Sequence, residues 1–543
     1  MVEDRGELAD GWHQFRVSYR DAVEFILRKD YRNTYAAEIK EEYTFMNQSQ
    51  YEDMFRNAGF RVLHSSPIYN AWIIENRFQG KVRIKGLDGR EMPFPATNYV
   101  IVGEKIPNNW GVRIVEQSST VLQESRFLTR KAMKDRRSGQ IFDLVGRPHQ
   151  TIDLLPYFKR KGKIFVLGKQ GFPRPIITSL GDDQHLDGIR NDGYMVEPIS
   201  FIWDGRSPRF ESIERELEKR AGVSKGEILQ RGSSQSYEFF VSPGLVAEKV
   251  TSLALGVKSR SGNFIDVPNY TDLSSAGSIR PIDAQQVLRS AQAGSVLDAR
   301  MEIATYNLML DSRVALGPWI GSEIQLVESP RSPHILDSIV NLLNPKQRRR
   351  VFVAEDSPSF GSYLEIKRGS YLEQDGRGNI LNRVEREYVV PREMSSSVVS
   401  ILPVLKSKGK IYVGLEKRHL PGVQANEGFS DIVVNPAWRI PKSIKDMDSA
   451  KKFVKDRLFQ DMGVVGSRIF SLGGPYHPSP GISPEVVHSF AVEIIFDRQM
   501  KPSELKALSW VALDELLEHR SLIRDAHLFV ASLRLAHALG VIK

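Results

Sequence analysis

The pattern of apolar and polar residues predicts two β-hairpins in distant parts of the chain. Residues 155–166 read LPYFKRKGKIFV, and residues 402–413 read LPVLKSKGKIYV. In each stretch two apolar runs flank a Lys-Gly turn, which is typical of a hairpin. Because the two stretches also match in residue type position by position, they indicate an internal repeat.

Two further landmarks recur in the same order. Residues 242–248 read SPGLVAE and residues 479–485 read SPGISPE, and each is followed by an apolar run that predicts a strand. The tetrapeptide LDAR at 297–300 and the pentapeptide IRDAH at 523–527 then open two apolar helical stretches. Chance produces one such pair far more readily than three in one order, so we interpret the chain as carrying two copies of one unit.

A helix is predicted between the first two landmarks of each copy. It covers Phe210–Ala221 in the first copy and Ser449–Met462 in the second, and a glycine follows each. Glycine directly after a periodic apolar run is a common helix stop. Each copy therefore has the order hairpin, helix, strand, helix, which predicts a mixed α/β sandwich. The first copy is longer, and a stretch rich in Gly, Ser and Asn at 256–280 accounts for much of the difference.

Composition limits the function classes only broadly. The 543 residues suffice for about three domains at roughly 150 residues each. The chain has no apolar stretch of about 20 residues, and its first ten residues do not resemble a signal peptide. It has no cysteine, which excludes disulfides and thiol chemistry and fits a cytoplasmic protein. The net charge of +9 favours anionic ligands but is too diffuse to indicate nucleic acid. The densest basic runs, 126–137 and 346–350, are interpreted as solvated surface or linker charge.

The order of these landmarks resembles the Nudix fold, in particular the branch that hydrolyses ADP-ribose and related nucleoside diphosphates. The resemblance covers about residues 145–317 and 390–543. In the second copy it extends to SWVALDEL at 509–516, which is similar to the Trp-x-x-x-Asp-Glu-Leu run before that family's last helix. The resemblance implies an α/β (α+β) protein with two α/β/α sandwich domains built on mixed sheets.

The catalytic box of that family is where the sequence departs from it. The box reads G-x5-E-x7-R-E-U-x-E-E-x-G-U, where U is aliphatic. Its glutamates fall on one helix face and hold Mg²⁺, which activates water against a pyrophosphate. Neither copy has a recognisable upstream Gly-x5-Glu. The first helix keeps five of the remaining positions: Arg215, Glu216, Leu217, Gly222 and Val223.

Of the paired glutamates, only one position in the second copy keeps a carboxylate. The first helix has Lys219 and Arg220 at these two positions, which would repel Mg²⁺. In the second helix Arg457 replaces the first glutamate, and Gln460 and Asp461 replace the pair. We therefore expect hydrolysis to be weak or lost.

The resemblance implies a set of candidate site residues. The loop glutamates Glu248 and Glu485 are the candidate catalytic groups, although surface carboxylates after a Ser-Pro-Gly turn would look the same. Glu216 and Asp461 are the candidate metal ligands, with Mg²⁺ as the metal if the protein is hydrolytic and no cofactor otherwise certain. The candidate ligand-binding cations are Arg215, Lys219, Arg220 and Arg418.

The N-terminal 106 residues have a different character. Helices are predicted at 21–28 and 48–58, and strands at 60–64 and 98–103. The order AGFRV at 58–62 and TNYVIV at 97–102 is similar to the last third of class I methyltransferases that use S-adenosylmethionine, where an antiparallel hairpin closes the sheet. The Gly-rich turn of the cofactor-binding half is missing, so methyltransferase activity is not expected. The segment is interpreted as a partial Rossmann-like remnant, which packs on the first copy or pairs with a partner chain that completes it.

These interpretations divide the chain into a methyltransferase-like segment (1–106), a first Nudix-like domain (107–327), a connector with leading strands (328–389) and a second Nudix-like domain (390–543). The leading hypothesis is a tandem Nudix-fold protein that binds an ADP-ribose-like nucleoside diphosphate or acts as a scaffold or sensor. The first alternative is a Mg²⁺-dependent hydrolase that uses Asp461 and Glu485. The second is a methyltransferase-associated assembly protein. Membrane partners are not expected, and nucleic acid is not favoured.

Overall fold

The protein is a mixed α/β structure, as the sequence predicts. The computed structural model describes residues 2–5, 12–15, 18, 47–57, 60–80, 82–86, 88–94, 96–105, 113–147, 149–178, 186, 193–203, 210–229, 236–259, 265–266, 277–333, 338–344, 348–355, 363–374, 378–463, 466–494 and 508–542. The chain divides into two compact units, Met1–Gly111 and Val112–Lys543. Within the described part of the chain, no helix is both long and apolar enough to cross a membrane.

The described residues of the first unit form two small sheets. One has the order β2-β1-β4-β5, and the other is the antiparallel pair β3-β6. The predicted helix at 48–58 and the two predicted strands are confirmed as α3, β3 and β6, whereas the predicted helix at 21–28 lies outside the described residues. The bounds are β1 Val2–Arg5, β2 Trp12–Phe15, α3 Gln48–Asn57, β3 Phe60–Ile68, α4 Ala71–Ile73, a π-helical turn Ile74–Phe78, β4 Val82–Lys85, β5 Glu91–Met92 and β6 Asn98–Lys105.

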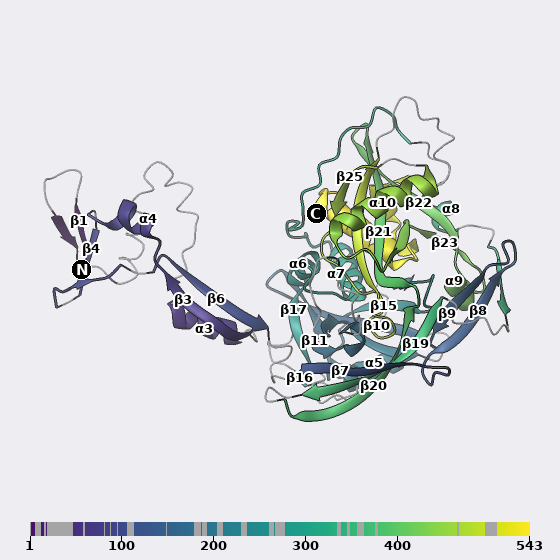
Figure 1. The fold of residues 1–543 in the computed structure, drawn as a ribbon, viewed down its shortest axis with the longest axis horizontal. Helices are drawn as coiled ribbons and strands as arrows, with labels where there is room; N and C mark the ends of the chain where they lie inside the picture. The colour runs from purple at the N-terminus through teal and green to yellow at the C-terminus, as the bar shows by residue number, and fades with distance from the viewer. Residues whose placement is uncertain are drawn as a thin grey trace. The chain divides into compact units, whose positions relative to one another are not determined.

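Two large sheets form the centre of the second unit (Figure 1). The first has the order β14-β15-β10-β11-β17-β16, with β12 on β11 and β13 on β10. Its bounds are β10 Gln150–Arg160, β11 Lys163–Pro173, β12 Tyr194–Glu197, β13 Ile199–Trp203, β14 Tyr237–Phe240, β15 Lys249–Gly256, β16 Ile265–Asp266 and β17 Ser278–Asp283. The second has the order β23-β22-β21-β26-β25, with β24 on β21 and β27 on β22. Its bounds are β21 Met394–Ser407, β22 Lys410–His419, β23 Asp431–Val434, β24 Ala437–Pro441, β25 Gly466–Ser471, β26 Val486–Ile494 and β27 Ser509–Ala512.

Both predicted hairpins are confirmed, and the two sheets share one topology. Each hairpin's first strand pairs in parallel with the strand that follows its Ser-Pro-Gly loop. The register is the same in both sheets, because Leu155 lies opposite Ala254 and the matching Leu402 lies opposite Ala491. We call the elements from β10 to α7 the first lobe and those from β21 to α12 the second lobe.

Helices cover these sheets in the same order in both lobes. Both predicted helices after the hairpins are present, and the second starts at Met447 because Asp446 caps it. The bounds in the second unit are α5 Phe210–Ala221, α6 Ala284–Gln292, α7 Ala299–Asp311, α8 Ile339–Leu343, α9 Pro421–Glu427, α10 Met447–Met462, α11 Leu513–Glu518 and α12 Ala526–Ala538, with 3-10 turns at Pro175–Thr178, Lys225–Glu227 and Arg520–Leu522. The helix α7 packs on β10 and β15, and α12 packs on β21 and β26.

The two lobes meet through a pair of matched backbone contacts. The amide of Phe240 donates to the carbonyl of Arg524 at 2.8 Å, and the amide of His477 donates to the carbonyl of Leu297 at 2.6 Å. Phe240 and His477 each lie two residues before a Ser-Pro-Gly loop, and Leu297 and Arg524 each precede the aspartate that caps α7 or α12. The contact that the first lobe's strand makes with the second lobe's helix start is therefore matched by an equivalent contact from the second lobe to the first. Such reciprocal contacts are typical of a twofold interface between identical subunits.

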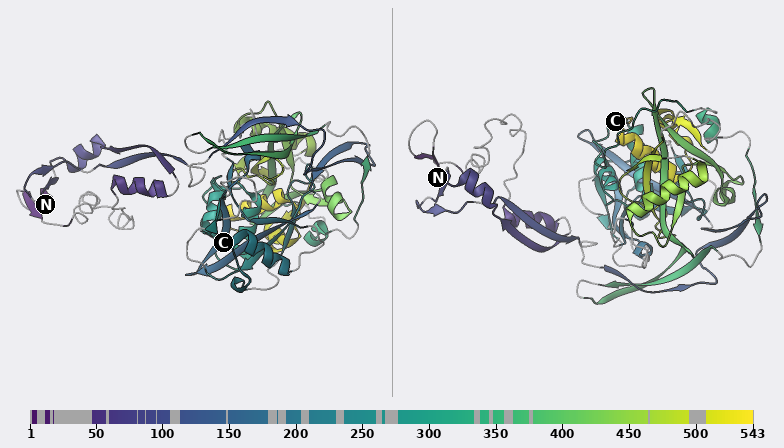
Figure 2. Two further views of the ribbon diagram at one scale, coloured as in Figure 1. Left: turned by 90° about the horizontal axis from the view of Figure 1, so that it is seen from below. Right: turned by 45° about the horizontal axis from the view of Figure 1, so that its top comes forward.

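Strands outside the lobes form two further sheets, with orders β18-β8-β9 and β20-β19-β7. Both sheets join strands that lie far apart in the sequence, and Figure 2 shows them at the border of the unit. The bounds are β7 Arg113–Val121, β8 Thr129–Asp135, β9 Ile141–Gly146, β18 Phe352–Glu355, β19 Leu364–Gln374 and β20 Ile380–Pro391. The segments before each lobe are thus interleaved, because each segment adds the third strand to a hairpin of the other.

Candidate functional site

The helix positions that the resemblance assigns to metal ligands hold an ion pair in both lobes. In α5 the Arg220 Nε donates to the Glu216 carboxylate at 2.6 Å. In α10 the Arg457 guanidinium lies 2.7 Å from the Asp461 carboxylate. The two pairs occupy matching positions one helical turn apart, with the charges exchanged. Each pair is nearly neutral as a unit, so neither helix presents an uncompensated carboxylate there.

The other predicted cations of α5 lie on its solvent side. Arg215 and Lys219 are exposed, whereas Ile213 and Leu217 are buried against the first sheet. The structure therefore brings Glu216 and Arg220 together, and leaves Arg215 and Lys219 at the surface of the same helix.

The loop glutamate of the first lobe is buried, and it contacts side chains of both lobes. Glu248 accepts hydrogen bonds from Thr151 at 2.7 Å and from Ser479, in the second lobe's Ser-Pro-Gly loop, at 2.6 Å. Arg147 lies 3.7 Å away. Burial by itself raises the pKa of Glu248, but the charges of Arg147 and Arg300 and the two hydroxyl donors lower this pKa overall. Glu248 is thus held as an anion that joins the lobes.

The loop glutamate of the second lobe lines a pocket of about 250 Å³, which we call the loop pocket. Glu485 forms an ion pair with Arg439, and His527 lies 3.9 Å away. Arg418 also lines this pocket, so two of the predicted site residues come together there. The first lobe supplies another wall through residues 242–245.

Asp461 does not line the loop pocket, but it is electrostatically linked to it. The Trp438 Nε1 donates to Asp461 at 2.8 Å. Burial raises the pKa of Glu416, the nearby Asp461 raises it further, and Arg418 opposes the shift. Arg418 lies 3.1 Å from Glu416. The positive charge of Arg418 is therefore partly compensated before any ligand enters.

These residues do not fit a magnesium site. Mg²⁺ prefers oxygen ligands in a near-octahedral arrangement. Across the described ranges, no group of three or more His, Cys, Asp or Glu side chains is placed to hold a metal ion. The candidate carboxylates Glu216, Asp461 and Glu485 are each in an ion pair with an arginine, and Glu248 is buried beside Arg147. An arginine lies beside each of these carboxylates, and its positive charge disfavours a metal ion there.

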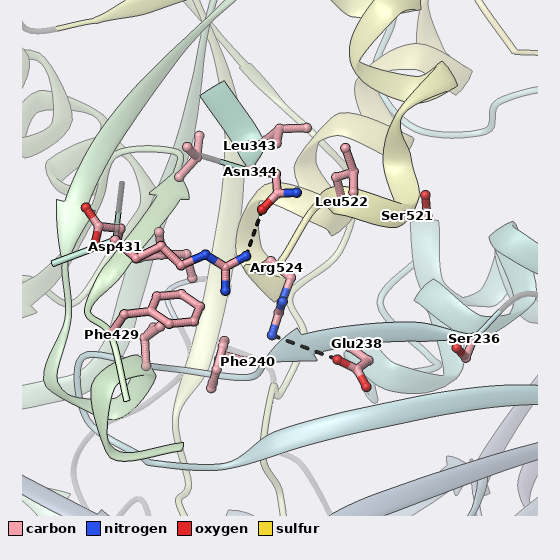
Figure 3. Close-up of a pocket in the computed structure, with 14 residues that line it drawn as sticks. Ser236, Glu238, Phe240, Leu343, Asn344, Phe429, Asp431, Ser521, Leu522 and Arg524 are labelled. Carbon is pink, nitrogen blue, oxygen red and sulfur yellow. Dashed lines mark hydrogen bonds and ion pairs between the residues drawn. The ribbon is translucent and has the colours of Figure 1, made fainter. Parts of the chain in front are cut away.

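A second pocket, of about 300 Å³, was not anticipated from the sequence (Figure 3). We call it the arginine pocket, because Arg348 and Arg524 both line it. Figure 3 shows Arg524 extending toward Glu238, 3.9 Å away, with Phe240 and Phe429 on another side of the pocket. The remaining polar lining residues are Ser236, Asn344, Asp431 and Ser521.

The two arginines of this pocket differ in their partners. Arg524 belongs to a closed network in which it and Lys249 both contact Glu238 and Glu427. Arg348 instead donates to the Asn344 Oδ1 at 2.8 Å, and its guanidinium carbon lies 4.1 Å from the centroid of the Phe429 ring. Its described partners are neutral, so the positive charge of Arg348 is available to an anion.

The sequence contains the two arginines within recognisable patterns, but it does not indicate that they share a pocket. Arg348 belongs to the basic run 346–350, whose pattern predicts solvated surface or linker charge, and Arg524 belongs to the third repeated landmark. No pattern in the sequence relates the position of Arg348 to that of Arg524. Only the contact between the lobes brings the connector, the first lobe and the second lobe to one cavity.

Comparisons with known proteins give weak likenesses. No protein-family model and no curated protein sequence matches this chain. An Ap4A hydrolase of C. elegans, solved in a binary complex, is similar to 30% of this chain over 98% of its own length, with 15% identity and a TM-score of 0.20. An ADP compounds hydrolase is similar to 36% of this chain over 93% of its own length, with 11% identity and a TM-score of 0.24. These TM-scores are too low to carry a conclusion about the activity of this chain.

Proposed function

We propose that this protein binds a phosphate-bearing small molecule of the nucleoside-diphosphate type in the arginine pocket, without a divalent cation. The observation that carries the proposal is the position of Arg348, whose guanidinium lies on an aromatic ring in a pocket shared with Arg524. A planar guanidinium can bind two phosphate oxygens at once, and it does not need a metal ion to do so.

The other lining groups suit the sugar part of such a ligand. Carboxylate, amide and hydroxyl groups of Glu238, Asp431, Asn344 and Ser521 surround the two arginines. Carboxylates accept hydrogen bonds from ribose hydroxyls, and hydroxyl or amide groups both donate and accept. The volume of about 300 Å³ lies at the small end of the usual range for ligand pockets. We therefore expect a compact ligand or the binding of one part of a larger one.

The ion pairs of the two helices support binding without hydrolysis. A hydrolase of the resembled branch needs carboxylates that are available to Mg²⁺, and here Glu216 and Asp461 are engaged by arginines. The alternative of a Mg²⁺-dependent hydrolase would require Glu485 to leave Arg439. We place the ligand in the arginine pocket rather than on α5, because Arg220 already has Glu216 as its partner.

The domain division remains part of this proposal. The shared strand order, register and reciprocal contacts support two copies of one domain within the second unit. The scaffold role and the methyltransferase-associated role stay open alternatives, and the partner chain that would complete the first unit stays a prediction.

The test is calorimetric titration of the full chain with ADP and with ADP-ribose, once in excess EDTA and once in Mg²⁺. We expect saturable binding in EDTA, and Arg348→Glu should weaken it about 10- to 100-fold, because a charged hydrogen bond contributes roughly 1.5–3 kcal/mol. Arg137→Glu makes the same charge change at an exposed arginine outside the pocket and should leave the affinity unchanged. Chromatography of the ligand after incubation should show no cleavage.

Three results would contradict the proposal. Binding that requires Mg²⁺ would restore a metal-dependent site. Binding that survives Arg348→Glu but is lost in Lys219→Glu would place the ligand on α5. Cleavage that Glu485→Ala abolishes would favour the hydrolase.

A further inference from the structure

A further pocket lies between the hairpin β8-β9 and the second lobe, away from the residues of the arginine pocket. Its volume is about 300 Å³. Two cross-strand pairs of the hairpin form one wall, because Thr129 lies opposite Gly146 and Lys131 lies opposite Leu144. Residues two apart on a strand share a face, so all four positions lie on the same side of the hairpin.

The polar side chains of this pocket are hydrogen-bond donors or can act as donors. Lys131 supplies an ammonium, Arg147 a guanidinium, Thr129 a hydroxyl and Asn426 an amide. No carboxylate is among the described residues that line it. The formal charge of the lining is therefore positive, unlike that of the other two pockets, where acidic and basic residues both occur.

Small residues give the cavity its space and hold the lobes close beside it. A Cβ at Gly146 would lie 3.1 Å from the Cβ of Ala247, so glycine permits the close approach of this loop. The Asn426 amide of α9 donates to the carbonyls of Ala247 and Gly422 at 3.3 and 2.9 Å. These contacts fix the walls without using Lys131.

Contacts at the junction of the lobes hold the Arg147 side chain in place. It donates to the carbonyl of Gly481, in the second lobe, at 3.0 Å and lies 3.7 Å from Glu248. Burial lowers the pKa of the Arg147 guanidinium, while Glu248 opposes this effect. An arginine remains charged at such shifts, and an anion beside it would compensate for the lost solvation.

We propose that this pocket, which we call the hairpin pocket, binds the phosphate group of a small anionic molecule through Lys131, Arg147, Thr129 and Asn426. The site is separate from the arginine pocket, and the two share no lining residue. The pocket volume of about 300 Å³ is much larger than the roughly 30 Å³ that one water molecule occupies in the liquid. The hairpin pocket therefore has room for organic atoms beside a phosphate group. The organic part of the ligand would contact Leu144, Ala247 and Ala425.

The hairpin pocket also ties ligand binding to the junction of the lobes. Arg147 follows β9 and donates a hydrogen bond to Gly481 in the second lobe. A phosphate that binds Arg147 would stabilise the folded state in which this contact exists. We therefore expect an occupied hairpin pocket to raise the thermal stability of the second unit.

The experiment is titration of the full-length Arg348→Glu variant with inorganic phosphate and with glycerol 3-phosphate, at constant ionic strength set with sodium chloride. This background weakens the arginine pocket, so failure of one site does not imply failure of the other. We expect saturable binding and a raised Tm with at least one of the two probes. Lys131→Glu should weaken that binding at least tenfold, and Thr129→Val should weaken it less.

The matched control is Lys452→Glu, which makes the same charge change at an exposed position of α10. It should leave phosphate affinity unchanged.

Tighter binding of glycerol 3-phosphate would identify an organic phosphate as the ligand, and equal or tighter binding of inorganic phosphate would identify the free ion. The absence of saturable binding, or equal losses in Lys131→Glu and Lys452→Glu, would overturn the proposal. Unliganded Lys131→Glu should keep the parental Tm, because Lys131 is exposed and its loss removes no core contact.

Discussion

At the residue scale, Lys169 is an ionisable side chain in a buried position where its charged form is disfavoured. It is buried on β11, and its ammonium lies 4.7 Å from the centroid of the Phe172 ring. Burial lowers the pKa of Lys169 to about 8, although Glu197 opposes the shift. The matching position of the second hairpin is Glu416, and burial raises the pKa of that carboxyl. Both hairpins therefore carry an ionisable group at this position, buried at Lys169 and partly buried at Glu416, with opposite charge.

Lys169→Met should change how stability depends on pH. Because the folded-state pKa lies below the ordinary value of 10.5, the contribution of Lys169 is fully present above pH 10.5 and is lost as the pH falls to about 8. The free energy of unfolding of the wild type, relative to that of Lys169→Met, should fall by about 3 kcal/mol over this interval. Glu197 keeps Arg174 as a partner in the variant. Urea titrations between pH 8 and 10.5 measure the difference, and a constant difference would contradict the interpretation.

At the scale of elements, the helices α7 and α12 are where the lobes share a core. Arg534 of α12 donates two hydrogen bonds of 2.7 Å to Glu302 of α7, and both side chains are buried. Arg534 also donates to the carbonyls of Leu472 and Gly474 at 2.8 and 2.6 Å. A buried ion pair of this kind is costly to break, because the remaining charge stays out of water.

Glu302→Ala should therefore destabilise the protein by about 3–5 kcal/mol, measured by chemical denaturation at neutral pH. The matched control is Arg457→Ala, which breaks the partly exposed pair with Asp461 on α10. This control should cost about 1 kcal/mol or less, because solvent screens exposed ion pairs. Replacing both Glu302 and Arg534 by leucine should recover part of the loss. Equal effects of Glu302→Ala and Arg457→Ala would show that the buried pair has no special role.

The elements also show what local sequence can predict. The hairpins follow from two apolar runs around a Lys-Gly turn, in which Gly162 and Gly409 have positive φ angles of 76° and 73°. The helices α5 and α10 follow from their apolar faces and the glycine after each. These signals are local, because each depends on residues within a few positions along the chain. The pairing of Thr129 with Gly146, by contrast, is visible only in the folded hairpin.

At the scale of the whole molecule, the two lobes of the second unit share a hydrophobic cluster. One cluster of buried residues includes Tyr237 and Phe239 of the first lobe and Phe529 of the second. The Phe529 ring lies 6.0 Å from Tyr237 and 6.2 Å from Phe239, centroid to centroid. Because this cluster contains apolar residues of both lobes, we expect the lobes to unfold together.

Phe529→Ala should reveal this dependence. Removing a buried phenylalanine costs roughly 3–5 kcal/mol, since it leaves a cavity that the surroundings fill only partly. Amide hydrogen exchange should then accelerate in β10 and β15 of the first lobe as well as in β21 and β26 of the second. Faster exchange confined to the second lobe would contradict a shared core.

The sequence by itself determined the repeat, the hairpins and the helices that follow them, because turn residues and apolar periodicity act over short stretches of chain. It also placed Arg418 and Glu485 among the candidate site residues, and the structure brings both to the loop pocket. The tertiary structure alone decided which charges are compensated. Arg220 and Asp461 have partners on their own helices, whereas Arg348, in a run interpreted as linker charge, faces a pocket. The reason is physical: the effect of a charge depends on the groups within a few ångströms in space, and most of these come from distant parts of the sequence.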